Sequence, residues 1–585
     1  MVSIPLDELS DDKGISFTPS EATPRVSRSS AEDHSDYSAR YIEKGEAPLT
    51  RVETEVVYPS AKKTAVILLA AGLATFLVAL DRLIIATATP KITDQFHSLG
   101  DVGWYASSYL LGMCATQLFW GKVYTFYNSK IIYLSAIGLF EVGSVICGAA
   151  PSSNAFIVGR AVAGVGSAGI FSGSIIIVTY ILPLHKRPMV VGLFGSIFGI
   201  SSVIGPLLGG AFTDKVSWRW CFYINLPIGA VTFAILVFIL HLQPVKNDKT
   251  PREKFMQLDP YGSVVFLPGI VCILLALQWG GTTYAWNSGR IIALFVLGGV
   301  LLAAFVGIQI WKQEMGTIPP RIIKQRSILC AFLYVNFVSG SMVTLLYFLP
   351  LWFQAVKNVD AVQSGIDTLA MVLSMVVAVI SSGIFVSKVG YYVPPMLLGP
   401  VFMSVGAGLL TTFTINSSSA HWIGYQVIYG IGLGMGMQQA NMTAQTCLPR
   451  KDISIGVSLM FFGQSLGGAI FVCIGQTVFT NSLATSLASV NGLDAKAIVQ
   501  AGATQLRNLV PAANLAVVLV DYNNALTRSF IVALACCAVA IIPALGIEWM
   551  SVKKDVLVKQ PTAAAAAAPT TKETPEAPKK SEDEL

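Results

Sequence analysis

Long apolar stretches, separated by short polar connections, follow one another along most of the chain. Most are close to twenty residues long, the length that a helix needs to cross a hydrocarbon core of roughly 30 Å. The pattern predicts an all-α polytopic membrane protein with fourteen transmembrane helices, at residues 64–86, 103–120, 131–149, 155–181, 189–211, 220–241, 262–279, 290–312, 328–354, 365–386, 394–413, 421–443, 454–478 and 527–549.

The composition agrees with a membrane protein and excludes several other classes. Of 585 residues, 54% are hydrophobic and 12% are charged, whereas about a quarter of a soluble domain is charged. The net charge of +6 comes from basic residues at span ends, so it does not indicate nucleic-acid binding. The nine cysteines lack metal or redox spacing and are interpreted as packing residues. The sequence has no ATP-binding P-loop, clustered metal ligands or nucleophile elbow, so we expect neither an enzyme nor a metal or cofactor.

The charges between the spans predict the orientation. An N-terminus in the cytoplasm places nineteen Lys and Arg residues on that side and eight on the other. Basic residues are enriched in cytoplasmic loops. Both termini are therefore expected in the cytoplasm.

An internal repeat with an offset of about 264 residues divides the chain into two similar halves. Gly192 and Gly199 correspond to Gly456 and Gly463, and Gly121 corresponds to Gly383. Parallel halves of this kind form a substrate site between them. The predicted organisation has five parts. They are a disordered N-tail (1–60), a first six-helix half (61–242), a linker with spans seven and eight (243–315), a second six-helix half (316–550) and a disordered C-tail (551–585). The second half includes an outer segment at 479–526.

The fifth apolar stretch carries the most specific motif. Its small residues and proline allow close backbone contact and a bend; they are Gly192, Gly199, Gly205, Pro206, Gly209 and Gly210. The order resembles the fifth-helix antiporter signature of major facilitator exporters, with Ser201 where that signature has a glycine. The following Trp218-Arg219-Trp220 and Ile224-Asn225-x-Pro227 resemble the fourteen-span drug:proton antiporter branch.

The resemblance runs from about residue 64 to 549 and implies a function. It implies the major facilitator fold, with two six-helix halves and two extra central helices. It also implies a monomer in the plasma membrane lipid bilayer that exchanges protons for toxic or secondary-metabolite molecules. Two alternatives stay open, because fold does not fix direction. One is a siderophore or nutrient importer; the other is a non-transporting membrane sensor, which the long N-tail permits.

Ionisable residues within the predicted spans are candidates for proton coupling, because such groups are expensive in a bilayer. Asp81 in span 1 and Arg160 in span 4 come to similar depths, and Glu141 lies near the middle of span 3. Arg160 matches an arginine that the family associates with proton transfer. The motif around Asp81 resembles the family's first-helix motif, although Arg82 is atypical there. The alternative is a static ion pair between two helices.

Further candidates concern the substrate and the outer face. Tyr425, Gln426 and Gln464 are mid-span polar residues expected to line a substrate cavity. Asn416 begins a glycosylation sequon in the outer loop between spans 11 and 12, whereas the sequon at Asn441 is expected to stay unmodified at the cytoplasmic end. The segment from Gly121 to Lys130 is predicted to be a loop that resembles the facilitator gating loop, without its usual aspartate–arginine pair.

Overall fold

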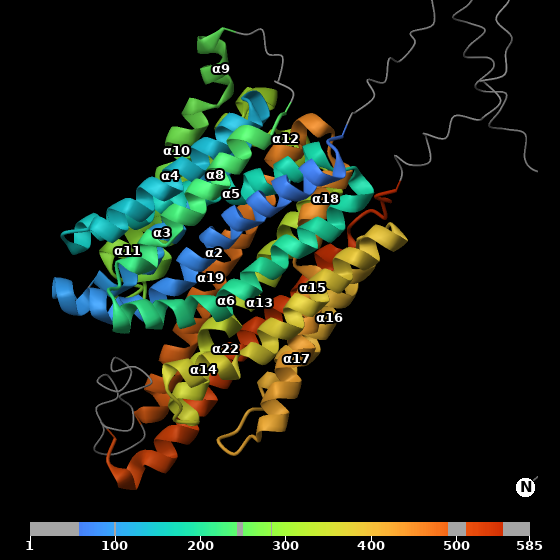
Figure 1. Cartoon of the computed structure of the whole chain (residues 1–585). Coiled ribbons are helices and arrows are strands. Elements are labelled where there is room, and N and C mark those ends of the chain that lie inside the picture. Colours follow the sequence, from blue (N-terminus) through green and yellow to red (C-terminus); the bar gives the residue numbers. More distant parts are fainter. Residues whose placement is uncertain (1–57, 99–100, 243–249, 282, 489–509, 554–585) are drawn as a thin grey trace, which may run out of the picture. The chain divides into compact units, whose positions relative to one another are not determined.

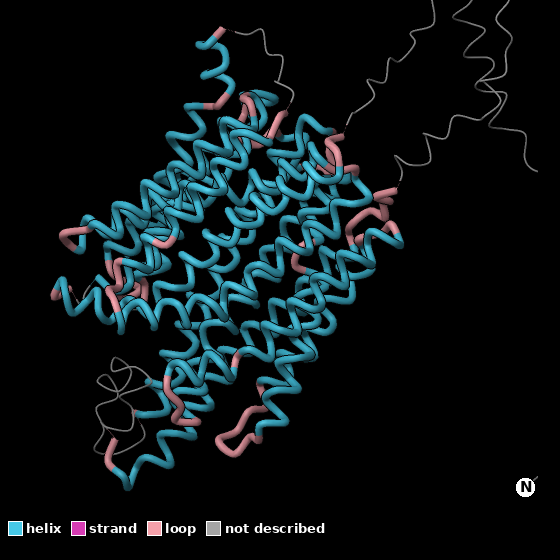
Figure 2. Tube along the Cα trace, viewed as in Figure 1, coloured by secondary structure: helices cyan, strands magenta, loops and turns pink. Residues whose placement is uncertain are grey.

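The computed structural model describes residues 58–98, 101–242, 250–281, 283–488 and 510–553 (Figure 1). Helices make up nearly all of this part of the chain (Figure 2). The first group comprises α2 Ala61–Phe96, α3 Val102–Phe126, α4 Ser129–Ala149, α5 Ser153–Ile181, η2 Leu184–Lys186, α6 Arg187–Lys215, α7 Trp220–Tyr223 and α8 Asn225–Ile239.

The remaining helices follow in chain order. The connecting group comprises α9 Pro251–Gln257, α10 Pro260–Trp279, α11 Gly289–Lys312 and η3 Gln313–Met315. The last group comprises α12 Pro320–Ile323, α13 Arg326–Val356, α14 Ala361–Asp367, α15 Leu369–Val389, α16 Val393–Leu410, α17 Ser419–Gly436, α18 Gln439–Cys447, η4 Arg450–Asp452, α19 Ile453–Leu487 and α22 Ala512–Leu545.

Twelve helical segments of the described chain are long and apolar enough to cross a membrane. A helix occupies each of the fourteen predicted places, but α3 and α17 do not reach the hydropathy that defines the twelve. The all-helical membrane architecture is therefore as predicted, whereas the count of fourteen spans stays a prediction. The apolar outer surface of α11 agrees with a lipid environment, since large side chains such as Val300 and Trp311 are 62% and 76% exposed.

Several helices extend past the ends of the predicted spans. The segment expected to be a loop after span 2 is helical as far as Phe126, because no proline interrupts it and Gly121 packs tightly inside the bundle. The expected outer segment 479–526 is partly helical, because α19 continues to Leu487 and α22 begins at Ala512. Its middle lies outside the described residues, as do most of both predicted tails.

The start of the predicted C-tail is also bound to the second half. The backbone N–H of Val552 donates to the carbonyl of Gly390 at 2.8 Å. Gly390 ends α15 with a φ of +99°, a conformation that favours glycine. Residues 551–553 therefore belong to the folded bundle.

Two seams join the first and last groups of helices. At one seam α6 packs on α15, and at the other α3 packs on α19. The connecting helix α10 covers the second seam, where Phe266 contacts Phe462 with ring centroids 5.5 Å apart. Helix α10 packs on α3 of the first group, and α11 packs on α10 (Figure 1). We call the end of the bundle where α2 begins, which is predicted to face the cytoplasm, the inner end, and the opposite end the outer end.

Candidate functional site

A cavity of about 500 Å³ lies between the two halves. Its walls come from α2, α3, α5 and α6 of the first group, from α13 and α19 of the last group, and from the connecting helix α10. Gly103 and Gly280, at the outer ends of α3 and α10, belong to its lining. The cavity therefore extends from the middle of the bundle toward the outer end. Its surface is mostly apolar, with several glutamine amides, which suits an amphipathic organic molecule.

The two halves touch closely at the inner end. A Cβ atom added to Gly192 of α6 would lie 2.9 Å from the carbonyl oxygen of Val379 on α15, and one added to Gly383 would lie 2.7 Å from the carbonyl of Pro188. At the other seam, a Cβ on Gly121 would lie 2.8 Å from Ser458. Gly121 and Gly383, matched in the sequence repeat, thus occupy equivalent contacts. In this conformation the halves are closed at the inner end.

The antiporter signature divides between two partners along α6. Gly192 and Gly199 face α15 of the other half, whereas Gly205 and Gly209 face Leu83 and Ile84 of α2. Gly210 has no neighbouring atom within 4 Å of an added Cβ, so the expectation of a close packing contact was wrong there. The helix continues through Pro206.

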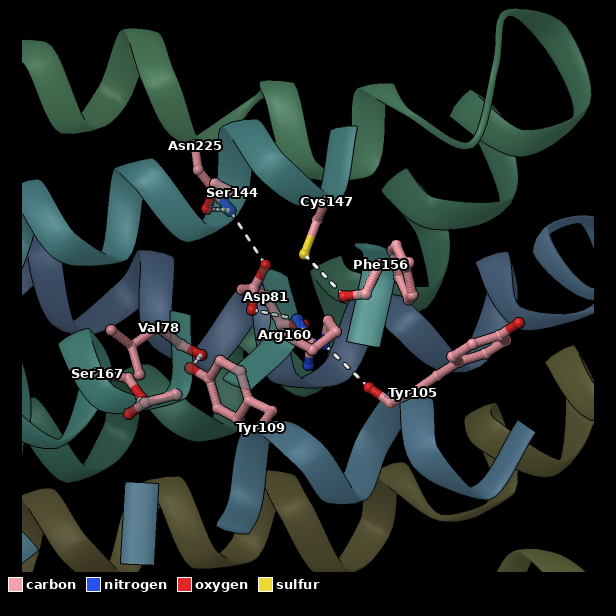
Figure 3. Close-up of polar contacts among 11 residues, drawn as sticks. Val78, Asp81, Tyr105, Tyr109, Ser144, Cys147, Phe156, Arg160, Ser167 and Asn225 are labelled. Carbon is pink, nitrogen blue, oxygen red and sulfur yellow. Dashed lines mark hydrogen bonds and ion pairs between the residues drawn. The ribbon is translucent and has the colours of Figure 1, made fainter. Parts of the chain in front are cut away.

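A buried ion pair joins α2 and α5. The guanidinium of Arg160 donates to the Asp81 carboxylate at 2.5 Å, and these side chains are 1% and 0% exposed. Arg160 also donates through Nε to the carbonyl of Tyr105 at 3.0 Å and lies over the Tyr109 ring at 4.4 Å. Figure 3 shows Arg160 between Asp81 and the Tyr105 backbone. The depth argument from the sequence thus placed these two residues together.

Asn225 completes the surroundings of Asp81. Its amide donates to the second carboxylate oxygen of Asp81 at 3.2 Å and to Ser144 at 3.1 Å (Figure 3). Asn225 belongs to the tail of the signature and begins α8, but the sequence analysis gave it no role. Its signal in the sequence is an amide within a membrane-length apolar stretch. The Asp81 carboxylate on α2 therefore bonds directly to α5 and α8, and Asn225 extends the network to Ser144 of α4.

Glu141 lies apart from this pair. Both of its carboxylate oxygens are buried, and no hydrogen-bond donor among the described residues reaches either one. The carboxylate rests against Gly229 of α8. Ser144, one helical turn along α4, is the link from this helix to Asn225 and Asp81. The structure thus places Glu141 near the ion-pair network without a direct bond to it.

A polar network around Asp259, which lies just before α10, fixes the connecting helices at the inner end. The Asp259 carboxylate accepts from Gln309 and from Thr317 and pairs with Lys312 at 3.2 Å. Burial acts to raise the pKa of Asp259, but the hydrogen bonds outweigh it, so the pKa lies below its ordinary value. In the described part of the chain, no group of three His, Cys, Asp or Glu side chains could hold a metal ion.

Residues 71–472 match the sequence profile of the Major Facilitator Superfamily. The chain belongs to this family. Proteins of similar sequence include the rubrofusarin-specific efflux pump aurT of Gibberella zeae, which is 52% identical over 85% of this chain and 92% of that protein. The efflux pump aflT of Aspergillus parasiticus is 49% identical over 85% and 97%. The efflux pump roqT of Penicillium rubens is 50% identical over 82% and 90%.

Solved structures show the same facilitator fold. The proton:xylose symporter XylE bound to 6-bromo-6-deoxy-D-glucose matches with a TM-score of 0.52 and 14% identity over 83% of this chain and 95% of that one. The human organic anion transporter TETRAN matches with a TM-score of 0.52 and 12% identity over 81% and 99%. The predictions of the family and of small-molecule efflux are confirmed, while proton coupling stays a prediction.

The facilitator cavity includes only one of the three predicted substrate residues. Gln464 of α19 lines it. Gln426 instead faces α14, where its amide donates to the Asp367 carbonyl at 3.0 Å, and Tyr425 stacks on Phe413. The prediction that Tyr425 and Gln426 face this cavity was wrong, because α17 packs behind α15 and α16. Arg82, which the sequence analysis treated only as atypical, does line the cavity.

Proposed function

We propose that this facilitator is a proton-coupled efflux pump that exports small amphipathic organic molecules by alternating access. The observation that carries the proposal is the Asp81–Arg160 ion pair, which is fully buried at 2.5 Å. The ion pair does not line the cavity but lies next to its wall. Arg82, which follows Asp81, and Leu110, which follows Tyr109, both belong to the lining. A change of charge at Asp81 therefore acts on the neighbouring residues that line the cavity.

The coupling follows from the bonds of the pair. A proton on Asp81 removes the negative charge that holds Arg160 at 2.5 Å. The guanidinium then keeps its bond to the Tyr105 carbonyl and its contact with Tyr109 on α3. The packing of α2 against α5 weakens relative to that of α3 against α5. A proton that binds Asp81 in one conformation and leaves it in the other would thereby drive the switch between the inward-open and outward-open conformations.

The proposed topology has fourteen spans. Helices α3 and α17 complete the twelve apolar ones, since both run the length of the bundle, α3 against α5 and α19 and α17 against α15 and α16. Polar residues such as Gln117 lower the apolar character of α3, but they lie inside the protein and hydrogen-bond there. We place the halves at residues 61–242 and 316–550, with both termini in the cytoplasm and the protein as a monomer in the plasma membrane.

The substrate class follows from the cavity and the relatives. The lining combines Phe171, Phe194 and Phe461 with amides such as Gln464. We infer that the substrate is a bulky secondary metabolite, toxin or drug with few polar groups, in keeping with a relative named for rubrofusarin efflux.

Reconstituted vesicles loaded with a fluorescent aromatic compound and exposed to an imposed pH gradient test this function. A pump of the proposed kind moves the compound against its gradient when protons flow the other way. An importer moves it in the opposite direction under the same gradient. A sensor moves nothing in either direction, and this result would refute transport altogether.

Glu141→Gln should weaken uphill efflux and change its pH dependence, because the variant keeps the size of the side chain and removes its exchangeable charge. We expect a smaller loss than at Asp81, since the Glu141 carboxylate has no hydrogen bond to the ion-pair network in the described residues. Initial efflux rates between pH 5 and 8 measure the effect (about the range in which a perturbed carboxyl group can titrate). Glu253→Gln, on the exposed helix α9, is the matched control. An unchanged pH profile would assign Glu141 to packing.

Asn416 should carry a glycan if the outer end faces the cell exterior. Asn416 is exposed in the turn between α16 and α17, whereas Asn441 is 2% exposed near the inner end. A glycosidase-sensitive mass shift should disappear in Asn416→Gln and persist in Asn441→Gln. The reverse result would invert the proposed orientation.

A further inference from the structure

The cavity has an unusual balance of charge. Among the described residues that line it, Arg82 is the single charged side chain, and no Asp or Glu is present. Its other polar groups are hydroxyls, thiols and the amides of four glutamines: Gln278, Gln438, Gln464 and Gln476. A lone guanidinium in an apolar setting is costly unless an anion accompanies it.

The neighbouring acid does not neutralise Arg82. Successive residues of a helix point about 100° apart, and Asp81 points toward α5 and α8, where Arg160 and Asn225 hold both of its carboxylate oxygens. Arg82 points instead toward the cavity and α6. The ion pairs among the described residues do not include Arg82, whose guanidinium lies 5.8 Å from the centre of the Phe198 ring.

The rest of the lining is adapted to an apolar molecule. Phe198 of α6 lies beside Arg82, and Phe194 and Leu110 also line the cavity. A guanidinium forms two parallel hydrogen bonds to a carboxylate, and it also donates charge-assisted hydrogen bonds to the single oxygen of a phenolate. Aromatic rings nearby would accept the apolar body of the molecule.

We propose that Arg82 selects for organic acids, so that this pump binds aromatic or apolar compounds in the form that carries an ionised carboxyl or phenol group. This inference rests on the proposed efflux function and assigns the cavity's charged subsite. In this proposal Asp81 belongs to the proton-coupling ion pair, whereas Arg82 binds the substrate.

Binding of two matched probes to the purified full chain in lipid nanodiscs tests the assignment. The probes are 2-naphthoate and 2-naphthamide, which share a ring system and differ in charge. A hydrogen-bonded charged contact should favour the acid by about tenfold to a hundredfold in dissociation constant. We expect Arg82→Gln to bind the two probes equally and Arg82→Lys to keep part of the preference.

Two readouts separate this result from misfolding and from failure of the pump itself. Retained naphthamide binding by Arg82→Gln shows that the cavity is intact. Arg290→Gln removes a guanidinium that bonds Tyr284 outside the cavity, and it should leave both affinities unchanged. An acid preference that persists in Arg82→Gln, or a wild-type protein that binds both probes equally or neither, overturns the assignment. Uphill efflux of a neutral compound in vesicles reports on the proposed function independently.

Discussion

Asp81→Asn should abolish uphill efflux while the protein still reaches the membrane. Asparagine keeps the size of the side chain and one oxygen that can accept from Arg160, but its NH2 group cannot accept the bond from Asn225, and the side chain cannot exchange a proton. Substrate should still equilibrate across vesicles, yet an imposed pH gradient should no longer concentrate it. Asp214→Asn, at an exposed position near the outer end of α6, is the control and should pump normally.

Arg160→Ala should stop efflux for an additional reason. It leaves the Asp81 carboxylate fully buried without its cation, and breaking a buried pair in this way costs about 3–5 kcal/mol. We therefore expect a lower yield of folded protein as well as lost transport. The double variant Asp81→Asn with Arg160→Gln removes both charges, so it should recover the yield but not the pumping. Normal pH-dependent efflux by the single variants would reduce the pair to a static link between α2 and α5.

Gly192→Val should block transport by preventing closure at the inner end. An added Cβ at Gly192 would lie 2.9 Å from the Val379 carbonyl oxygen, and the γ carbons of valine need still more room. Overpacking of this kind costs about 1–3 kcal/mol, which at about 1.4 kcal/mol per tenfold moves the equilibrium roughly five- to a hundredfold away from the closed inner end. The clash exists only while α6 and α15 touch, so the opposite conformation is spared.

Spin labels at exposed positions Ile131 and Tyr391, in a variant without reactive native cysteines, would measure the change. Their distance distribution should shift to longer values in Gly192→Val. Gly210→Val is the matched control on the same helix, since an added Cβ there meets nothing within 4 Å. A wild-type distance distribution together with intact efflux in Gly192→Val would refute the packing argument.

Much of the architecture could be predicted because it depends on local properties of the chain. Apolar length predicts where helices cross a bilayer, and the glycine repeat relates the halves before any contact is known. The depth of Asp81 and Arg160 also follows from helix rise alone. Helix ends were predicted less well, since α19 and α22 extend past their apolar stretches into the polar segment between them.

The sequence by itself determined the helices, the two halves and the family, together with the charged residues that lie within the membrane spans. Only the tertiary structure decided how each helix is rotated. It placed Arg82 in the cavity and Asp81 behind the wall, and it turned Gln426 toward α14. The physical reason is that lipid tails and the protein interior are both apolar, so a membrane helix shows little difference between its faces. Which side of such a helix meets a partner is decided by packing between segments far apart in the chain.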